Sequence, residues 1–373
     1  MTAGTVKATA ADGRRLWWTQ PVVSFYPLWL ALFAALGAAT WLGLGERRGP
    51  PSPAVPAPTD LAAFLAWGVP VEMEENDDVI NVTPRVSVDP RGGFLVADER
   101  EGQVRLYRPD GALARVIGRK GSGPGEFRSL SAAHRLPDGR IAAVEMGGRV
   151  SVFDSAGAKL LHVKQAPVAP LYSAEVLDAR HLLFTGRRIG TGGTALVHVY
   201  NVETGAVTRS FMGIPRHPPE MAGGYAFAGT ASAVARGDTV AAVFALSDSI
   251  YLFDSTGRDL GRIAIPFERF RRLDQPMPTS GGTLEAFRGW SETFSAISQL
   301  YWLHDGSMVV QYYDMKGVEP QWRLLHMDRA GQRRFEGIDT PRLLAAGGAG
   351  DELVFVHPAA DAPNVWVPAR LKP

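Results

Sequence analysis

Short runs of alternating hydrophobic and polar residues recur along the chain after residue 60. Each run ends in a large residue, followed by Asp or Asn and then by Gly; the first copy is 104–111. Later copies occur at 150–157, 197–205, 250–257 and 324–331. Because alternation with a period of two is typical of half-buried strands, the chain is predicted to repeat a β-unit of about fifty residues.

A second signature precedes each copy and consists of a strand, a polar turn and a strongly apolar strand. It occurs at 86–97, 134–144, 174–184, 233–244, 300–310 and 343–356. Together the two signatures predict six four-stranded sheets, each with two buried inner strands and two alternating outer strands. Each such sheet must be covered on both faces by its two neighbours, which requires the sheets to be arranged around an axis. We therefore predict an all-β six-bladed β-propeller over residues 61–373.

The sixth repeat lacks a strand, because only six residues follow the strand-like 365–367. Either of two strand-like segments near the start, 69–73 or 79–82, is expected to supply the missing strand. Pairing the beginning of the chain with the last blade would close the ring and remove an exposed sheet edge.

The first sixty residues have a different pattern. No charged residue occurs from Leu16 to Gly45, and five prolines follow within 49–58. This predicts a cytoplasmic tail at 1–20, a transmembrane signal anchor at 21–45 and a proline-rich linker at 46–60. A cleavable signal peptide is the alternative, because 34–39 is rich in small residues. The expected location is the cell inner membrane, crossed once, with the propeller on the periplasmic side.

Composition narrows the classes of function. Lys+Arg 39 against Asp+Glu 38 gives a net charge of +1, so the chain is not a general nucleic-acid binder. The absence of cysteine excludes disulfides, zinc-thiolate sites and a thiol nucleophile. Neither a Gly-x-Ser-x-Gly elbow nor a His-Glu-x-x-His motif occurs. We therefore predict no cofactor and no metal, and assign no catalytic residue.

One segment carries a family resemblance. The run 121–127 (GSGPGEF), followed by Asp138-Gly139 and by Val152-Phe153-Asp154, resembles the repeat of NHL-type six-bladed β-propellers, and the plan is similar to that of TolB-like propellers. The chain departs from that repeat at Glu145, where an Asp commonly ends the second strand. The resemblance implies the fold, whereas its function stays open because propellers serve as sensors, scaffolds, lyases and hydrolases.

Long connections between blades are expected at 118–130, 213–229 and 266–294, all on the rim that also carries the loops between second and third strands. Such insertions usually mark the binding face of a repeat protein. They and the neighbouring loop carry a set of cationic residues that would bind an anionic or peptide ligand: Arg187, Arg188, Arg216, His217, Arg269, Arg271, Arg272 and Arg288. The alternative is that these are solvated loop charges, several of them paired with Glu268 or Asp274.

Two further expectations concern the same rim. Asp98, Glu145 and Asp314, at the ends of second strands, should accept hydrogen bonds from backbone donors in their own turns. The i,i+3 pairs Phe267/Phe270 and Phe287/Trp290 predict two short helical pieces packed on the disc.

The leading hypothesis is a membrane-tethered propeller that binds a protein, peptide or envelope polymer on the face with the insertions, and does not bind nucleic acid. One alternative is a metal-dependent hydrolase or lyase, similar to lactonases, with its site at the central funnel. Another is a sensor or assembly scaffold of an envelope complex.

Overall fold

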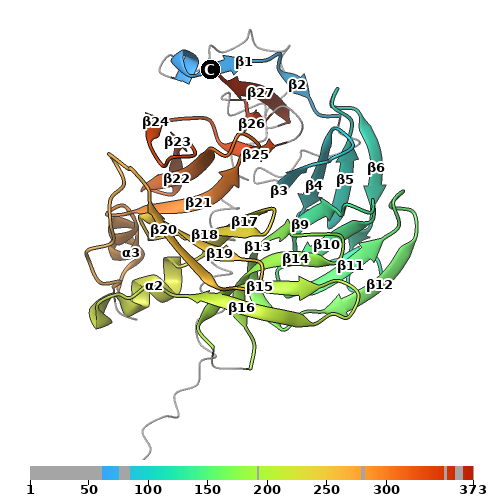
Figure 1. Cartoon of the computed structure of the whole chain (residues 1–373), viewed down its shortest axis with the longest axis horizontal. Helices are drawn as coiled ribbons and strands as arrows, with labels where there is room; N and C mark the ends of the chain where they lie inside the picture. Colours follow the sequence, from blue (N-terminus) through green and yellow to red (C-terminus); the bar gives the residue numbers. More distant parts are fainter. Residues whose placement is uncertain are drawn as a thin grey trace, which may run out of the picture. The chain divides into compact units, whose positions relative to one another are not determined.

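The computed structural model describes residues 61–74, 85–190, 193–278, 282–347, 351–357 and 364–372, all within one unit of the chain, 54–373. Their strands form six antiparallel sheets arranged as blades around an axis, with β3, β9, β13, β17, β21 and β25 innermost (Figure 1). The prediction of an all-β six-bladed propeller is therefore confirmed. The predicted tail, anchor and linker lie outside the described residues, among which no helix combines the length and apolarity needed to cross a membrane.

The first three blades follow the chain in order. Blade 1 holds β3 (Arg85–Val88), β4 (Phe94–Asp98), β5 (Gln103–Tyr107) and β6 (Leu113–Ile117). Blade 2 holds β9 (Leu130–Arg135), β10 (Ile141–Glu145), β11 (Arg149–Phe153) and β12 (Leu160–Gln165). Blade 3 holds β13 (Val168–Val176), β14 (His181–Arg188), β15 (Ala195–Asn201) and β16 (Val207–Gly213).

The last three blades include the one that closes the ring. Blade 4 holds β17 (Ala231–Arg236), β18 (Thr239–Phe244), β19 (Ser249–Asp254) and β20 (Asp259–Ala264). Blade 5 holds β21 (Ser295–Trp302), β22 (Met308–Lys316), β23 (Glu319–Met327) and β24 (Arg333–Gly337). Blade 6 combines β25 (Leu343–Gly347), β26 (Glu352–Val356) and β27 (Val365–Leu371) with β1 (Leu65–Trp67) and β2 (Val71–Glu72), which follow the 3-10 turn η2 (Leu61–Ala63).

Burial extends one strand further from the axis than the sequence predicts. The third strands β5, β11 and β15 are almost wholly buried, and a strict alternation occurs in an outermost strand such as β12. The expectation of two alternating outer strands per blade is therefore wrong. Polar residues of these third strands are buried and hydrogen-bonded. His198, for example, is 0% exposed, and its ring hydrogen-bonds to Ser210 Oγ (2.8 Å). Neighbouring blades cover both faces of these third strands, so the fourth strands are the more exposed ones.

The N-terminal strands close the ring by pairing with β27. Leu65 pairs with Leu371, and Val71 pairs with Trp366. The prediction that 69–73 supplies the missing strand is right for β2 but misses β1, and 79–82 lies outside the described residues. The indole of Trp366 in turn meets the ring of Phe94 at 5.3 Å in a T-shaped contact, which joins blade 6 to blade 1.

The Asp-Gly turns between third and fourth strands press against the preceding blade. Gly111 has φ +84°, and a Cβ there would lie 2.2 Å from the carbonyl oxygen of Glu72 in β2. Gly157 has φ +68°, and a Cβ there would lie 2.3 Å from Ile117 at the end of β6. Glycine recurs in these turns because both the left-handed backbone and the close approach exclude a side chain.

Arginines connect neighbouring blades at the rim that carries the turns between first and second strands. Arg135 of blade 2 forms a buried ion pair with Asp89 of blade 1 (2.8 Å) and donates to the carbonyl of Ser155 (2.9 Å). Arg236 of blade 4 donates to the carbonyl of His304 in blade 5. Through these contacts, polar groups of this rim hold neighbouring blades together.

We expect the substitution Leu65→Ala to lower the free energy of unfolding by about 2–5 kcal/mol, the usual cost of emptying a packed leucine site. Leu65 in the closing strand is 1% exposed, whereas Val69 between β1 and β2 is 80% exposed. Urea unfolding of Leu65→Ala and of the control Val69→Ala checks this, with a change of less than about 0.5 kcal/mol expected for the control. Equal losses for the two variants would contradict a stabilising role for the closing strand.

Candidate functional site

The long connections between blades all lie on one rim, which we call the insertion rim. A blade of four antiparallel strands returns the chain to the rim where its innermost strand began, so every connection between blades falls on that side. Three are long: 118–129, 214–230 and 265–294. Their described residues contain the parallel pair β7 (Arg119–Lys120) and β8 (Glu126–Phe127), the 3-10 turn η3 (Pro219–Met221), and the helices α2 (Ala222–Ala228) and α3 (Leu284–Ser291).

The two helices pack on each other through aromatic side chains, at one side of the ring of blades (Figure 1). Phe227 of α2 meets Phe287 of α3 at 4.9 Å, and Phe287 meets Trp290 at 5.3 Å. The Thr283 side chain caps α3 by accepting a hydrogen bond from the amide of Ala286 (3.2 Å). The helical prediction for Phe287 and Trp290 is therefore confirmed.

The helical prediction for Phe267 and Phe270 is wrong. Their rings stack at 4.5 Å, but the segment is not helical. The amide of Glu268 donates to the Glu336 carboxylate (2.8 Å), and the amide of Arg271 donates to Ser295 Oγ (3.0 Å). Side chains of blade 5 thus accept hydrogen bonds from backbone amides that a helix would use for its own bonds. The rings of Phe267 and Phe270 pack on Tyr312 of the same blade.

Two of the predicted cationic residues are held in ion pairs. Arg271 pairs with Asp314 (3.2 Å) and donates to the carbonyl of Glu292 (2.6 Å). Arg272 pairs with Asp248. The expectation that Glu268 or Asp274 would be the partner is wrong for both, since Glu268 pairs with Arg333 (3.2 Å). These two arginines hold the insertion onto blades 4 and 5.

The other predicted residues divide between α2 and the exposed surface. Arg187 donates to the carbonyl of Ala226 in α2 (3.0 Å), and His217 stacks on Tyr225 at 4.4 Å. In the described part of the chain, the buried Nε atoms of Arg187 and Arg188 have no hydrogen-bond partner. Arg216, Arg269 and Arg288 are exposed on the same rim, and no side-chain partner is recorded for them among the described residues. Ligand binding by this set stays a prediction.

The carboxylates at the ends of second strands pair with arginines of the third strands. Asp98 pairs with Arg105 (3.1 Å), Glu145 with Arg149, and Asp314 with Arg323 (2.7 Å). Asp98 also accepts from a backbone donor of its own turn, Glu101 N (3.1 Å), as predicted. Sequence analysis missed the arginines, because alternation assigned them to a solvent-exposed face.

Glu145 and Asp314 differ from that expectation in where their other donors lie. Glu145 accepts from the amide of Arg128 (2.8 Å), which belongs to the connection between blades 1 and 2. Asp314 accepts from the hydroxyl of Ser295 (2.5 Å), at the start of β21. Glu145 therefore joins a second strand to an inter-blade connection, whereas Asp314 joins β22 to the first strand of the same blade.

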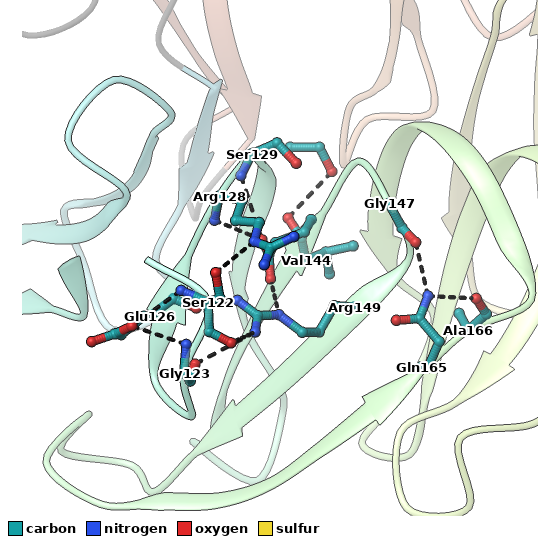
Figure 2. Close-up of polar contacts among 12 residues, drawn as sticks. Ser122, Gly123, Glu126, Arg128, Ser129, Val144, Gly147, Arg149, Gln165 and Ala166 are labelled. Carbon is teal, nitrogen blue, oxygen red and sulfur yellow. Dashed lines mark hydrogen bonds and ion pairs between the residues drawn. The ribbon is translucent and has the colours of Figure 1, made fainter. Parts of the chain in front are cut away.

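The glycine-rich run that carries the family resemblance is a self-contained structural loop (Figure 2). The Glu126 carboxylate accepts hydrogen bonds from the amides of Ser122 (3.1 Å) and Gly123 (2.9 Å), and these and the Arg119 ion pair lower its pKa. Arg149 donates to the carbonyls of Ser122 (2.8 Å) and Glu126. Backbone donors that would otherwise attract an external anion are thus already occupied by Glu126.

The residues at the axis were missed by sequence analysis, which searched the loops. Arg85 is the first residue of β3, and Arg342 directly precedes β25, so both stand at the insertion-rim end of neighbouring innermost strands. Arg85 Nη1 donates to the carbonyl of Tyr172 in blade 3 (3.0 Å), beyond blade 2. The register of β13 is irregular at this position, which turns the carbonyl out of the ladder. The guanidinium of Arg342 lies over the Trp322 ring at 5.4 Å.

Burial shifts the titration of this axial cluster, which we define as Arg85, Glu175, Tyr301 and Arg342. Burial and then the positive charge of Arg85 lower the pKa of Arg342 to about 10. Burial raises the pKa of Glu175 to about 8. Burial also raises the pKa of Tyr301, with Arg342 opposing and Glu175 adding to the shift. Glu175 is therefore mainly protonated at neutral pH, and the cluster is positively charged. The sequence signal that could have identified this cluster is the presence of charged residues, Arg85 and Glu175, inside innermost strands.

The side chain of Arg85 is solvent-exposed. Desolvation by the surrounding protein lowers its pKa, and the negative charge of Glu99 opposes this shift. A group that is surrounded by protein and still reached by water is accessible to a small ligand or to the end of a larger one.

A cavity of about 630 Å³ lies along the seam between blades 6 and 1, with Phe94 and Trp366 among its lining residues. Three of the charged residues that line it have ion-pair partners: Asp89 pairs with Arg135, Glu352 with Arg370 (2.6 Å), and His304 with Asp351 (2.9 Å). The fourth, Arg91, donates to the carbonyl of Ser155 (3.4 Å). The cavity follows the closing seam, and most of its charged groups are held within the protein.

Metal chemistry finds no support in the described residues, which contain no group of three or more His, Asp or Glu arranged to hold a metal ion. The carboxylates Asp98, Glu145 and Asp314 are engaged with arginines, as described above. No observation in this part of the chain favours the metal-dependent hydrolase or lyase.

Comparison with known proteins supports the fold. The sequence matches no protein-family model and no curated protein. The structure is similar to a member of the DUF4221 family from Bacteroides vulgatus, with TM-score 0.58 and 11% identity over 83% of this chain and 97% of the other. It is also similar to a putative exported protein from Bacteroides fragilis, with TM-score 0.53 and 15% identity over 83% and 96%.

BamB from Moraxella catarrhalis is a weaker match, with TM-score 0.42 and 13% identity over 83% of this chain and 98% of that chain. The two Bacteroides proteins, at 11% and 15% identity, show a shared fold and nothing of function. The NHL and TolB-like resemblance therefore stays an expectation from the sequence.

We expect Arg149→Ala to lower the free energy of unfolding by about 2 kcal/mol, because it leaves the buried Glu145 carboxylate without its counter-ion. The matched control is Arg119→Ala, which removes an arginine that is 79% exposed from the same loop. Its loss should stay below about 1 kcal/mol. Urea unfolding of both variants checks this, and a larger loss in the control would contradict the assignment of Arg149 as the residue that holds the loop.

We expect Glu175→Gln to change how stability depends on pH. The native pKa of about 8 exceeds the ordinary value of 4.5, so Glu175 favours folding below pH 4.5 and loses this contribution as the pH rises toward 8. The variant should match the wild type near pH 5 and exceed its thermal midpoint at pH 9. Glu285→Gln, at an exposed site of α3, is the control and should follow the wild type. Parallel pH profiles for Glu175→Gln and wild type would contradict the burial of this carboxyl.

Proposed function

We propose that this chain is a membrane-tethered, extracytoplasmic binding module that holds a protein, peptide or envelope polymer on its insertion rim. The difference between the two rims is the observation that carries the proposal. At the opposite rim, arginines such as Arg135 and Arg236 are tied to neighbouring blades. The insertion rim has ties of this kind at Arg271 and Arg272, and it carries in addition the long connections, two helices and the exposed Arg216, Arg269 and Arg288. Long connections and exposed side chains beyond those that hold the blades together are available for a ligand.

The chemistry of the insertion rim suits a partially charged polymer or peptide. The exposed cations Arg216, Arg269 and Arg288 stand among exposed apolar side chains, including Leu284 (63% exposed) and Ile189 (55% exposed). Arginine beside apolar surface is enriched where proteins recognise other chains, because the guanidinium binds anions and packs flat on apolar groups.

The tether and the location rest on the first sixty residues. An uncharged apolar segment at 21–45 and a proline-rich linker at 46–60 support a single membrane anchor with the propeller held away from the bilayer. The absence of cysteine fits either side of the membrane and favours none. The fold neighbour from Bacteroides fragilis is described as exported, which accords with an extracytoplasmic propeller.

Because the chain has no cysteine, single cysteines can test both halves of this proposal in the full-length protein. Arg288→Cys lies on the insertion rim, and Ala330→Cys lies in an exposed turn of the opposite rim. In spheroplasts, a membrane-impermeant maleimide should label both variants. A benzophenone attached to the cysteine should give a discrete photo-adduct from Arg288→Cys alone.

Two results would overturn the proposal separately. Absence of labelling in spheroplasts, with labelling after lysis, would place the propeller on the cytoplasmic side. Adducts of equal yield from both cysteines, or from Ala330→Cys alone, would show that the insertion rim is not the binding face. Thermal unfolding of the two variants controls for loss of the fold.

A further inference from the structure

The outermost strand of each blade has one edge that pairs with no other described strand, because it stands at the end of its sheet. In blades 1 to 5 this strand also carries a bulge of one residue near its start. The extra residues are Ala114, Leu161, Thr208, Leu260 and Arg334. A bulge makes an edge less suitable for pairing with another chain. Since these five blades share the bulge, their edges differ mainly in the side chains they expose.

The exposed side chains distinguish β12 of blade 2 from the outermost strands of the other blades. Each of those strands exposes at least one charged residue: Arg115 in β6, Arg209 in β16, Arg262 in β20, Arg334 in β24 and Glu72 in β2. The exposed residues of β12 are Leu161, Val163 and Gln165, and none of them is charged. Because charged side chains are a common protection of sheet edges, β12 is the described edge that lacks it.

The two faces of β12 have different surroundings. On one face the ring of His162 hydrogen-bonds with the carbonyl of Val202 in blade 3 (2.8 Å), which holds the strand against its neighbour. The residues that alternate with His162 lie on the other face, where Leu161 is 42% and Val163 is 37% exposed. The strand lies at the periphery of the ring of blades (Figure 1), so its edge and this apolar face are open together.

The charges around β12 are mainly positive. Lys159 directly precedes the strand and Lys164 lies within it. Arg115 of blade 1 lies beside the turn that leads into β12, since a Cβ at Gly157 would be 3.4 Å from its Cδ atom. No ion pair is recorded for these three cations among the described residues. The carboxylate of that turn, Asp154, accepts a hydrogen bond from the amide of Lys159 (3.2 Å). A segment with acidic side chains therefore complements this surface.

We propose that β12 is a site of strand addition, at which an extended segment of a partner protein with alternating acidic and apolar residues pairs with the free edge. Backbone hydrogen bonds extend the sheet of blade 2, the apolar residues cover Leu161 and Val163, and the acidic residues approach Lys159 and Lys164. A second copy of this chain suits the edge less well, because two paired β12 strands bring the same cations into one short ladder. This contact goes beyond the proposed function and does not depend on a ligand at the insertion rim.

The test uses the full-length protein in detergent micelles and, as the probe, a short capped and dye-labelled peptide of alternating valine and glutamate. Fluorescence anisotropy should show saturable binding to the protein and none to empty micelles. The same peptide with lysine in place of glutamate should bind at least about tenfold more weakly, because it repels the cations around β12. N-methylation of every peptide amide should cause a similar loss, because it removes the donors of the ladder.

Substitutions locate the site. Val163→Glu should weaken binding of the valine–glutamate peptide at least about tenfold, because it removes apolar contact and adds a like charge. The matched control is Val116→Glu in β6 of blade 1, where the wild-type side chain is 38% exposed, and its dissociation constant should equal that of the wild type. Lys164→Gln should weaken binding several-fold, and it supplies the answer if Val163→Glu does not fold.

The proposal is overturned if the valine–glutamate peptide does not bind saturably, or if Val163→Glu and Lys164→Gln bind it as tightly as the wild type. Equal affinity of the N-methylated peptide would show that no strand is added. Sedimentation equilibrium tests the other occupant: a dimer of the wild type that Val163→Glu converts to a monomer would assign the edge to a second copy and contradict the proposed partner.

Discussion

The pairing of β27 with the N-terminal strands β1 and β2 is the contact on which the architecture depends. It gives blade 6 its outermost strand and covers the edge of β27 that would otherwise be open. Trp366 then carries the closure from blade 6 to Phe94 of blade 1. Because the ring is closed, blade 6 lies beside blade 1 and the innermost strands have fixed neighbours around the axis. That order brings Arg85 and Arg342, distant in sequence, to neighbouring positions.

The even number of strands per blade separates structural from adaptable surface. Four antiparallel strands send every connection between blades to one rim, where length is tolerated. The other rim receives only tight turns, and the buried pair Arg135–Asp89 shows how such turns become part of the contact between blades. Insertions can therefore lengthen this rim while the ring of blades stays intact.

The sequence predicted the fold well because each repeat contains the pattern that marks its strands and turns. Alternation and Asp-Gly turns define strands and their direction, and from these follow the number of blades and the rim of the insertions. It predicted the outer strands less well, because the burial of a third-strand residue such as His198 depends on the adjacent blade. The first closing strand was missed because Leu65–Trp67 is too short to show a period.

The site was harder to predict than the fold for a similar reason. Composition identifies arginines in the loops but not their partners, so Arg271 and Arg272 read as ligand-binding residues although Asp314 and Asp248 hold them. Conversely, Arg85 and Glu175 lie within strands and gave no loop signal. Closure has one more consequence: Leu65 and Leu371, about three hundred residues apart in the chain, must meet before the ring exists. During synthesis the first strand must therefore wait for the last, and a prematurely terminated polypeptide would expose the seam of blade 1 to proteases and to other nascent chains.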